Sequence, residues 1–132
     1  MPQVLWAASG LIKRYAQETG SDAADAVFQF APLLPMIVTY LGYAETNASL
    51  RRKINGGTIN MGAYQIARSS VRNEVQTQLD FNILSITDAD ILAGIALTDC
   101  YNINASDASI LATYLRYAPA VSELCVVVAA DG

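Results

Sequence analysis

Three acidic residues stand beside predicted secondary-structure elements, at Glu45, Asp107 and Asp131. Their immediate neighbours are alanine, serine, threonine or glycine, and such small residues let carboxylates approach a common point. Three carboxylates held together would repel one another, so we expect at least one to have a raised pKa when no cation is bound. Oxygen ligands of this kind suit Mg²⁺ or Mn²⁺. Each acid alone has a plainer interpretation, since Asp107 can serve a helix dipole and Glu45 can be a solvated helix residue.

The other residue types exclude several kinds of catalytic site. The chain has no histidine, which excludes Ser-His-Asp and Cys-His catalysis and a histidine-bound zinc ion. Its two cysteines, Cys100 and Cys125, cannot form a thiolate zinc site, and their apolar surroundings predict small buried side chains in a reducing compartment. A disulfide between them stays open at this point. The single glycine pair, Gly56-Gly57, fits neither a phosphate-binding loop nor a dinucleotide-binding motif, so carboxylates must carry most of any chemistry.

Apolar runs that predict strands alternate with segments that predict helices. The strand-like runs cover residues 4–6, 36–40, 82–86 and 124–128, and the first and last are continuously apolar. Such a pattern favours a buried parallel sheet with helices on both faces. Asp131 follows the last run, while Glu45 and Asp107 lie in the first turns of predicted helices. Since ligands of α/β proteins bind at the carboxyl ends of the strands, we expect the acids to meet at that edge.

Capping residues and glycine predict where two helices begin or end. A helix is predicted from about residue 42 to the glycine pair, because glycine commonly follows a helix C-terminus. Four of its side chains are expected to face inward: Tyr43, Ala44, Ala48 and Leu50. Thr87, with Asp90 three residues later, predicts the start of a helix that runs to about residue 99.

Length and composition indicate one domain, residues 1–132, with a sizeable core. Apolar residues make up 53% and charged residues 15% of the chain, as in a well-buried globular protein. No apolar stretch is long enough to span a membrane and no signal-like segment opens the chain, which predicts a cytoplasmic protein without membrane contact. The net charge of −4 argues against broad nucleic-acid binding. Seven of the eight basic residues lie before position 73, however, which permits a local basic surface.

Four short segments, in the right order and over almost the whole chain, resemble the motifs of one protein family. VLWAASGLIKRY, residues 4–15, is similar to a first strand that runs into Asp-[Ala/Ser/Thr]-Ser-Ala-Leu-[Val/Ile]-Lys-[Arg/Leu]-Tyr. YAETNASLRRKINGG, residues 43–57, is similar to a second motif, in which a glutamate precedes an Ala/Leu helix rich in arginine. NASDASILATYL matches Asp-Ala-x-x-Leu-Ala-Thr, and VVVAADG matches a strand that ends in x-Ala-Asp. These are the motifs of the PIN-domain nucleases, in particular the VapC-type toxins.

The resemblance implies both a fold and a chemistry. The fold would be a three-layer α/β/α sandwich around a central parallel sheet, and the site a cluster of acids that binds Mg²⁺ or Mn²⁺. Glu45, Asp107 and Asp131 would be metal ligands or acids close to the metal, and Ser9 would be a nearby hydroxyl. The metal would activate water to cleave an RNA phosphodiester, which is the reaction of a Mg²⁺-dependent endoribonuclease toxin.

The resemblance also implies partners. Five basic residues near the motifs become candidates for contacts with the RNA backbone: Lys13, Arg14, Arg51, Arg52 and Lys53. A solvated helix surface or a contact with another protein is an equal alternative for them. The family further implies a homodimer and a small cognate antitoxin that neutralises the basic rim of the acidic site.

The first aspartate of the family falls at Ala7, although Ala8, Ser9 and the run from Leu11 to Tyr15 match the motif. One changed acid in an otherwise matching motif is typical of an inactivating substitution, and a natural pseudo-enzyme would look the same. We therefore expect an inactive or weakened ribonuclease. The resemblance also predicts that a last strand and helix, which the family has after its final motif, are missing from this sequence. The alternative function is a non-catalytic PIN-like scaffold or protein-binding domain.

Overall fold

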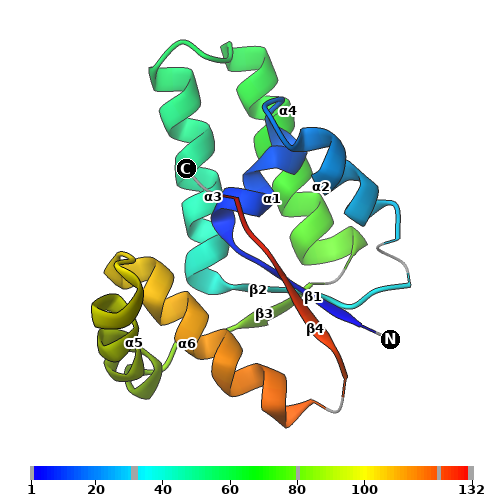
Figure 1. Cartoon of the computed structure of the whole chain (residues 1–132). Helices are drawn as coiled ribbons and strands as arrows, with labels where there is room; N and C mark the ends of the chain where they lie inside the picture. The colour runs from blue at the N-terminus through cyan, green and yellow to red at the C-terminus, as the bar shows by residue number, and fades with distance from the viewer. Residues whose placement is uncertain (1, 31–32, 80, 122, 131–132) are drawn as a thin grey trace.

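The computed structural model describes residues 2–30, 33–79, 81–121 and 123–130. Within these ranges, parallel strands form one sheet in the order β3-β2-β1-β4 (Figure 1). The strands are β1 (Gln3–Trp6), β2 (Met36–Thr39), β3 (Asn82–Leu84) and β4 (Cys125–Val128). Since β1 lies between β2 and β4, neighbours on both sides hold the backbone that leads to Ala7.

Helices occupy both faces of the sheet, as Figure 1 shows. They are α1 (Ala8–Tyr15), α2 (Ser21–Phe28), α3 (Tyr40–Asn55), α4 (Met61–Asn73), α5 (Asp88–Tyr101) and α6 (Ala105–Ala120), with a π-helix, η1 (Glu74–Gln78), directly after α4. The first four helices lie on one side of the sheet and α6 lies on the other, with α5 packed against α6. Helix α3 ends just before the glycine pair and α5 begins after Thr87, as predicted.

The alternation of side chains along β1 explains the two cores. Successive residues of a strand point to opposite faces of its sheet. Val4 and Trp6 therefore join the larger core under α1 to α4, whereas Leu5 joins a smaller core with Ile110 and Tyr114 of α6. Helices lie on both faces of the sheet, which confirms the predicted α/β class and its three-layer α/β/α arrangement.

The prediction for the buried face of α3 is partly wrong. Ala44 and Ala48 are exposed, and the buried positions are Gly42, Thr46 and Leu50, at a spacing of four residues. The Thr46 hydroxyl donates a hydrogen bond to the Gly42 carbonyl at 2.8 Å, so its polar group is satisfied in the core. Alanine fits either environment, and a pattern built on alanine therefore does not identify the inner face.

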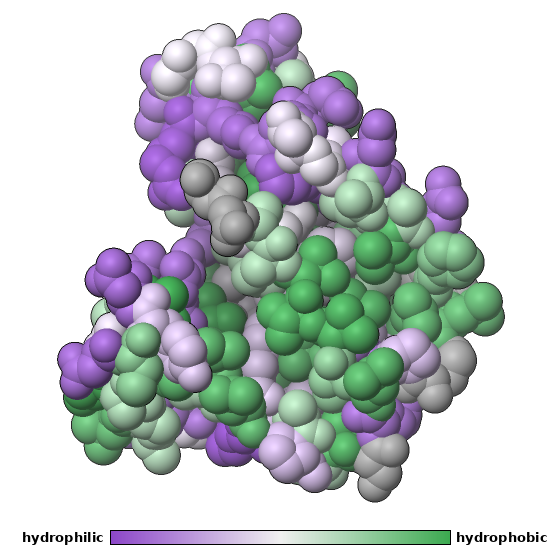
Figure 2. All heavy atoms as spheres, in the orientation of Figure 1, coloured by the Kyte–Doolittle hydropathy of each residue, from purple (hydrophilic) through white to green (hydrophobic). Residues whose placement is uncertain are grey.

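The prediction that the last strand is buried is also wrong. Val126 and Val127 point to opposite faces of the sheet, and the two residues are 45% and 48% exposed. Among the described residues, β4 pairs only with β1, which leaves its other edge open. Figure 2 shows hydrophobic side chains gathered over the region of β4. A continuous apolar run predicts a strand, but it does not distinguish a central strand from an edge strand.

The prediction that the two cysteines are buried is wrong for both of them. Cys100 on α5 is exposed and Cys125 is half-buried, and both are free thiols. Helix α5 has its main contact with α6, where a side chain at Gly94 would lie 3.1 Å from the Ala108 backbone. The outer surface of α5 is therefore left to solvent.

Although α5 is rich in apolar residues, no helix in the described ranges is long and apolar enough to cross a membrane.

Candidate active site

A pocket of about 510 Å³ lies where β1 and β4 end and α1 begins. It brings together most of the residues that the motifs single out, although they come from distant parts of the chain. Six of the residues that line it matter for the argument: Ala7, Ser9, Glu45, Arg52, Asp107 and Ala130. The carboxyl ends of parallel strands thus hold the candidate site, as expected for an α/β protein.

Glu45 is the acid that the pocket perturbs most clearly. Its Oε1 atom is buried and has no hydrogen-bond partner among the residues that the structure describes. Burial raises the pKa of Glu45 above its ordinary value, the charge of Asp107 raises it further, and Arg52 opposes the shift. The expectation of a raised pKa in the acid cluster therefore holds for Glu45, with burial rather than repulsion as its largest cause.

Asp107 reaches the pocket from the first turn of α6. The Oδ1 atom of Asn104, the N-cap residue of that helix, accepts a hydrogen bond from the Asp107 backbone N–H at 2.8 Å. This cap fixes the turn that carries the carboxylate, which itself is exposed. Asp107 therefore lies at the positive end of a helix and close enough to Glu45 to disfavour its charge, and its role as a metal ligand stays a prediction.

The chain after β4 is tied to the start of α1. The Ala130 N–H donates a hydrogen bond to Ser9 Oγ at 3.1 Å, which gives the predicted Ser9 hydroxyl a backbone partner. Gly10 permits this approach, because a Cβ atom there would lie 2.7 Å from the Val128 carbonyl oxygen. Asp131 lies outside the described residues, so its place at the site stays a prediction.

Ala7 occupies the N-cap position of α1, with φ −87° and ψ 155°. Its N–H donates to the Val128 carbonyl at 2.9 Å, and its own carbonyl accepts from the N–H of Leu11 at 2.9 Å. No side chain caps this helix. Aspartate is among the most favourable N-cap residues and alanine among the least, so position 7 would suit an aspartate for the helix as well as for a metal.

The acids present fit a weakly held divalent cation. No group of three or more His, Cys, Asp or Glu residues able to hold a metal occurs in the part of the chain that the structure describes. Mg²⁺ is nevertheless often bound by one or two carboxylates, with water and substrate phosphates completing its shell. Glu45 and Asp107 supply two such groups, and the unpartnered buried oxygen of Glu45 is the kind of donor that a cation would satisfy.

The five basic residues predicted to contact RNA have different environments. Arg52 lines the pocket, and its Nη2 donates a hydrogen bond to Ser49 Oγ at 2.9 Å. Lys13 and Lys53 both pair with Glu18, at 3.1 and 2.7 Å. RNA contact by these three residues stays a prediction.

Arg14 and Arg51 lie away from the candidate pocket. Arg14 pairs with Asp25 at 2.8 Å and with Glu74 at 3.0 Å, and its guanidinium lies 4.7 Å from the centre of the Phe28 ring. These contacts join α1 to α2 and η1. The Arg51 guanidinium lies 5.7 Å from the centre of the Tyr64 ring, between α3 and α4. For these two residues as well, contact with RNA stays a prediction.

Two polar residues of the pocket, Ser49 and Asn104, were not predicted from the sequence. Ser49 lies one helical turn after Glu45 on α3, and Arg52 follows close to the same face, so the helical period alone could have placed both beside Glu45. Asn104 lies three residues before Asp107, which is the spacing of an N-cap and its partner.

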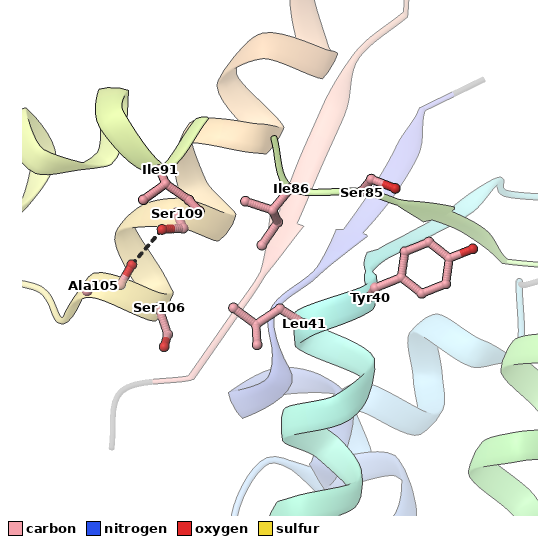
Figure 3. Close-up of a pocket in the computed structure, with 8 residues that line it drawn as sticks. All are labelled: Tyr40, Leu41, Ser85, Ile86, Ile91, Ala105, Ser106 and Ser109. Atoms are coloured by element: carbon pink, nitrogen blue, oxygen red, sulfur yellow. Dashed lines mark hydrogen bonds between the residues drawn. The ribbon is translucent and has the colours of Figure 1, made fainter. Parts of the chain in front are cut away.

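A second pocket, of about 590 Å³, has no charged side chain (Figure 3). It is lined by Tyr40, Leu41, Ser85, Ile86, Ile91, Ala105, Ser106 and Ser109. The Ser109 hydroxyl already donates to the Ala105 carbonyl at 2.8 Å, as the dashed line in Figure 3 marks. This pocket lacks acid–base groups apart from Tyr40, so its surface suits apolar contact rather than catalysis.

Glu45→Gln is expected to stabilise the metal-free chain, because it removes a charge that burial and Asp107 both disfavour. Solvent screening keeps the gain between a few tenths of a kcal/mol and about 1 kcal/mol. The raised pKa means that the folded chain binds a proton at a higher pH than the unfolded chain does, so the charge of Glu45 opposes folding at neutral pH. The gain should be present at pH 7 and vanish at about pH 3, which is well below the ordinary pKa of a glutamate, so that Glu45 is protonated in both states.

Thermal unfolding at the two pH values measures this effect. Asp99→Asn removes an exposed acid from α5 and serves as the matched control. An equal gain for Glu45→Gln at both pH values would contradict the electrostatic explanation.

The comparisons with known proteins bear on the fold. No family model matches the sequence, and no curated protein does. One similar solved structure is that of the Mycobacterium tuberculosis VapC20 toxin, which is described as cleaving the sarcin-ricin loop. It superimposes with a TM-score of 0.73 over 98% of this chain and 91% of its own, at 12% sequence identity. At that identity the likeness establishes a shared fold.

Proposed function

We propose that this chain, which has the fold of the VapC-type PIN-domain toxins, is a metal-dependent endoribonuclease toxin held in an inactive or weakened form by Ala7. The shared fold supports the resemblance seen in the four motifs. The observation that carries the proposal is the pocket beside Ala7, where the unpartnered oxygen of Glu45 lies close to the charge of Asp107. Paired acids of this kind are arranged for a cation rather than for the stability of the chain.

Glu45 and Asp107 are the described residues that would hold Mg²⁺ or Mn²⁺, with Asp131 as a further candidate. The cation would supply Lewis acidity to lower the pKa of water and to neutralise charge on an RNA phosphodiester. Arg52 lies on the same pocket wall and provides a fixed positive charge for a phosphate. The Asn104 cap and the Ser9–Ala130 hydrogen bond hold the surrounding backbone in place.

The partners follow from the same proposal. We include an RNA substrate, a cognate antitoxin and a second copy of the chain, acting in the cytoplasm. Exposed apolar side chains on α5, among them Ile91, Leu92 and Ile95, support contact with another protein. Light scattering that found only a monomer at micromolar concentration would remove the second copy from this proposal.

A non-catalytic scaffold is the alternative, and Ala7 favours it. Without a carboxylate at position 7, a protein-binding domain would need neither a metal nor a reactive pocket. The two functions differ in one measurable property, because only the nuclease requires the acids to bind a cation.

Titration calorimetry with Mn²⁺ tests the proposed site. The chain should bind Mn²⁺, and Asp107→Asn should weaken that binding by about tenfold or more. Asp99→Asn changes the charge equally at an exposed position on α5 and should leave binding unchanged. Equal Mn²⁺ affinity in all three proteins, or no binding at all, would favour the scaffold.

A further inference from the structure

The eight basic residues of the chain divide into two groups by their partners. Four form ion pairs with acids: Lys13, Arg14, Lys53 and Arg116. The other four have no ion pair with any acid in the ranges that the structure describes: Arg51, Arg52, Arg68 and Arg72. We call the second group the hairpin arginines, because all four lie on the helical hairpin of α3 and α4.

The hairpin arginines lead from the candidate active site across the hairpin. Arg52 lines the pocket that holds Glu45 and Asp107. Arg51 is about 100° further around α3 and lies over the ring of Tyr64 on α4. Arg68 and Arg72 follow on α4, one helical turn apart and both exposed. Four arginines that form no ion pair with a described acid are thus concentrated on one hairpin of a chain whose net charge is −4.

Arg68 and Arg72 line a groove between the two helices of about 740 Å³, which we call the α3–α4 groove. Its lining is completed by Tyr43, Asn47, Gln65 and Ser69. None of the residues that line the groove is aliphatic and none is acidic. Together with the two arginines, they offer two guanidinium groups, two amides, the Ser69 hydroxyl and the aromatic ring of Tyr43. A partner must therefore be anionic and rich in hydrogen-bond acceptors.

This chemistry favours RNA over an acidic peptide. A helical peptide bound in a groove is anchored by apolar side chains at helical spacing, and the α3–α4 groove has no aliphatic side chain to receive them. Phosphate oxygens accept hydrogen bonds from guanidinium and amide groups, and an aromatic ring can stack on an unpaired base.

We propose that the hairpin arginines and the α3–α4 groove bind the backbone of an RNA strand that continues from the candidate pocket. The inference rests on the proposed function, since it takes RNA as the substrate. It adds Arg68 and Arg72 to the RNA-binding surface. It also places Lys13, Arg14 and Lys53, each of which forms an ion pair with an acid, outside that surface.

Binding of a short labelled oligouridylate, followed by fluorescence anisotropy, tests the proposal in the chain as it stands. Four phosphate contacts to a single strand predict that log K falls with log salt concentration with a slope of about −3 between about 50 and 200 mM salt. The double substitution Arg68→Gln and Arg72→Gln should reduce the slope by about 1.4 and weaken binding roughly fivefold at low salt.

Two matched variants separate local contacts from net charge. Ala93→Glu and Ala96→Glu together lower the net charge by the same two units at exposed positions of α5, and this protein should keep the slope of the unchanged chain. Arg68→Lys and Arg72→Lys together keep both charges and should also keep the slope.

Three results would overturn the proposal. The chain could fail to bind oligouridylate at low salt, or the Gln variant could bind like the α5 variant. A polyglutamate peptide could instead bind in an Arg68- and Arg72-dependent manner while oligouridylate does not, which would assign the groove to an acidic protein.

RNA cleavage by an Ala7→Asp chain reports on the proposed function separately. If the Ala7→Asp chain cleaves RNA but RNA binding does not depend on Arg68 and Arg72, the proposed nuclease function stands and the proposed RNA-binding surface is wrong. If RNA binding depends on Arg68 and Arg72 but no RNA is cleaved, the RNA-binding surface stands and the proposed nuclease function is wrong.

Discussion

Ala7→Asp is expected to confer Mn²⁺- or Mg²⁺-dependent RNA cleavage, with a rate at least about 100-fold above that of the unchanged chain. Position 7 follows β1, the strand between β2 and β4, and its backbone is held by hydrogen bonds to Val128 and Leu11. A carboxylate there would add a ligand whose place the core determines. A metal held only by Glu45 and Asp107 would sit off its productive position, and misplacement of this order can slow a reaction about 100-fold.

Ala7→Asn is the control for this substitution, because position 7 is also a helix N-cap. Asparagine and aspartate are both good N-cap residues, so each should stabilise α1 by about 1 kcal/mol relative to alanine. Only the aspartate variant should bind Mn²⁺ more tightly, gain thermal stability in its presence and cleave RNA. If Ala7→Asp behaves like Ala7→Asn in all three measurements, the nuclease interpretation fails and the scaffold takes its place.

The sequence predicts best those features that depend on neighbouring residues. The capping box of α5 needs only Thr87 and Asp90, three residues apart, and the structure confirms both of its hydrogen bonds. The four strands could be located from short apolar runs for the same reason. The exposure of β4 could not be predicted, because it depends on which elements lie beside the strand. The residues around Val126 would look the same in a central strand and in an edge strand.

In the candidate site too, local patterns could be predicted from the sequence and contacts between distant residues could not. The motifs and the helical period bring Ser9, Glu45, Arg52 and Asp107 to one pocket with Ala7, as the resemblance implies. The partners of the basic residues could not be predicted, because they are distant in the chain. Arg14 and Glu74 are sixty positions apart, and no local pattern indicates that they form an ion pair. The selection of Arg68 and Arg72 over Lys13 and Lys53 as candidate RNA contacts therefore depends on the structure.

Asp90→Ala should have the largest effect on stability, a loss of about 3 kcal/mol. Asp90 is 3% exposed, and its carboxylate accepts hydrogen bonds from Arg116 at 2.8 and 2.9 Å, from the Thr87 N–H at 3.0 Å and from the Thr113 hydroxyl at 3.1 Å. Hydrogen bonds to a charged group contribute about 1.5–3 kcal/mol each and are not additive. Since Asp90 joins the start of α5 to α6, its loss should loosen this helix pair.

The pH dependence gives the same prediction a second measurement. Arg116, with Thr87 and Thr113, holds the pKa of Asp90 well below its ordinary value. The unfolded chain therefore takes up a proton near pH 4 while the folded chain does not, so Asp90 stabilises the fold above that pH and its contribution is lost as the pH falls. Urea unfolding between pH 7 and pH 3 should show a steeper loss of stability in the unchanged chain than in Asp90→Ala. Asp88→Ala removes an exposed acid from the same helical turn, and equal stability of the two variants at pH 7 would show that the Asp90 contacts do not hold α5 to α6.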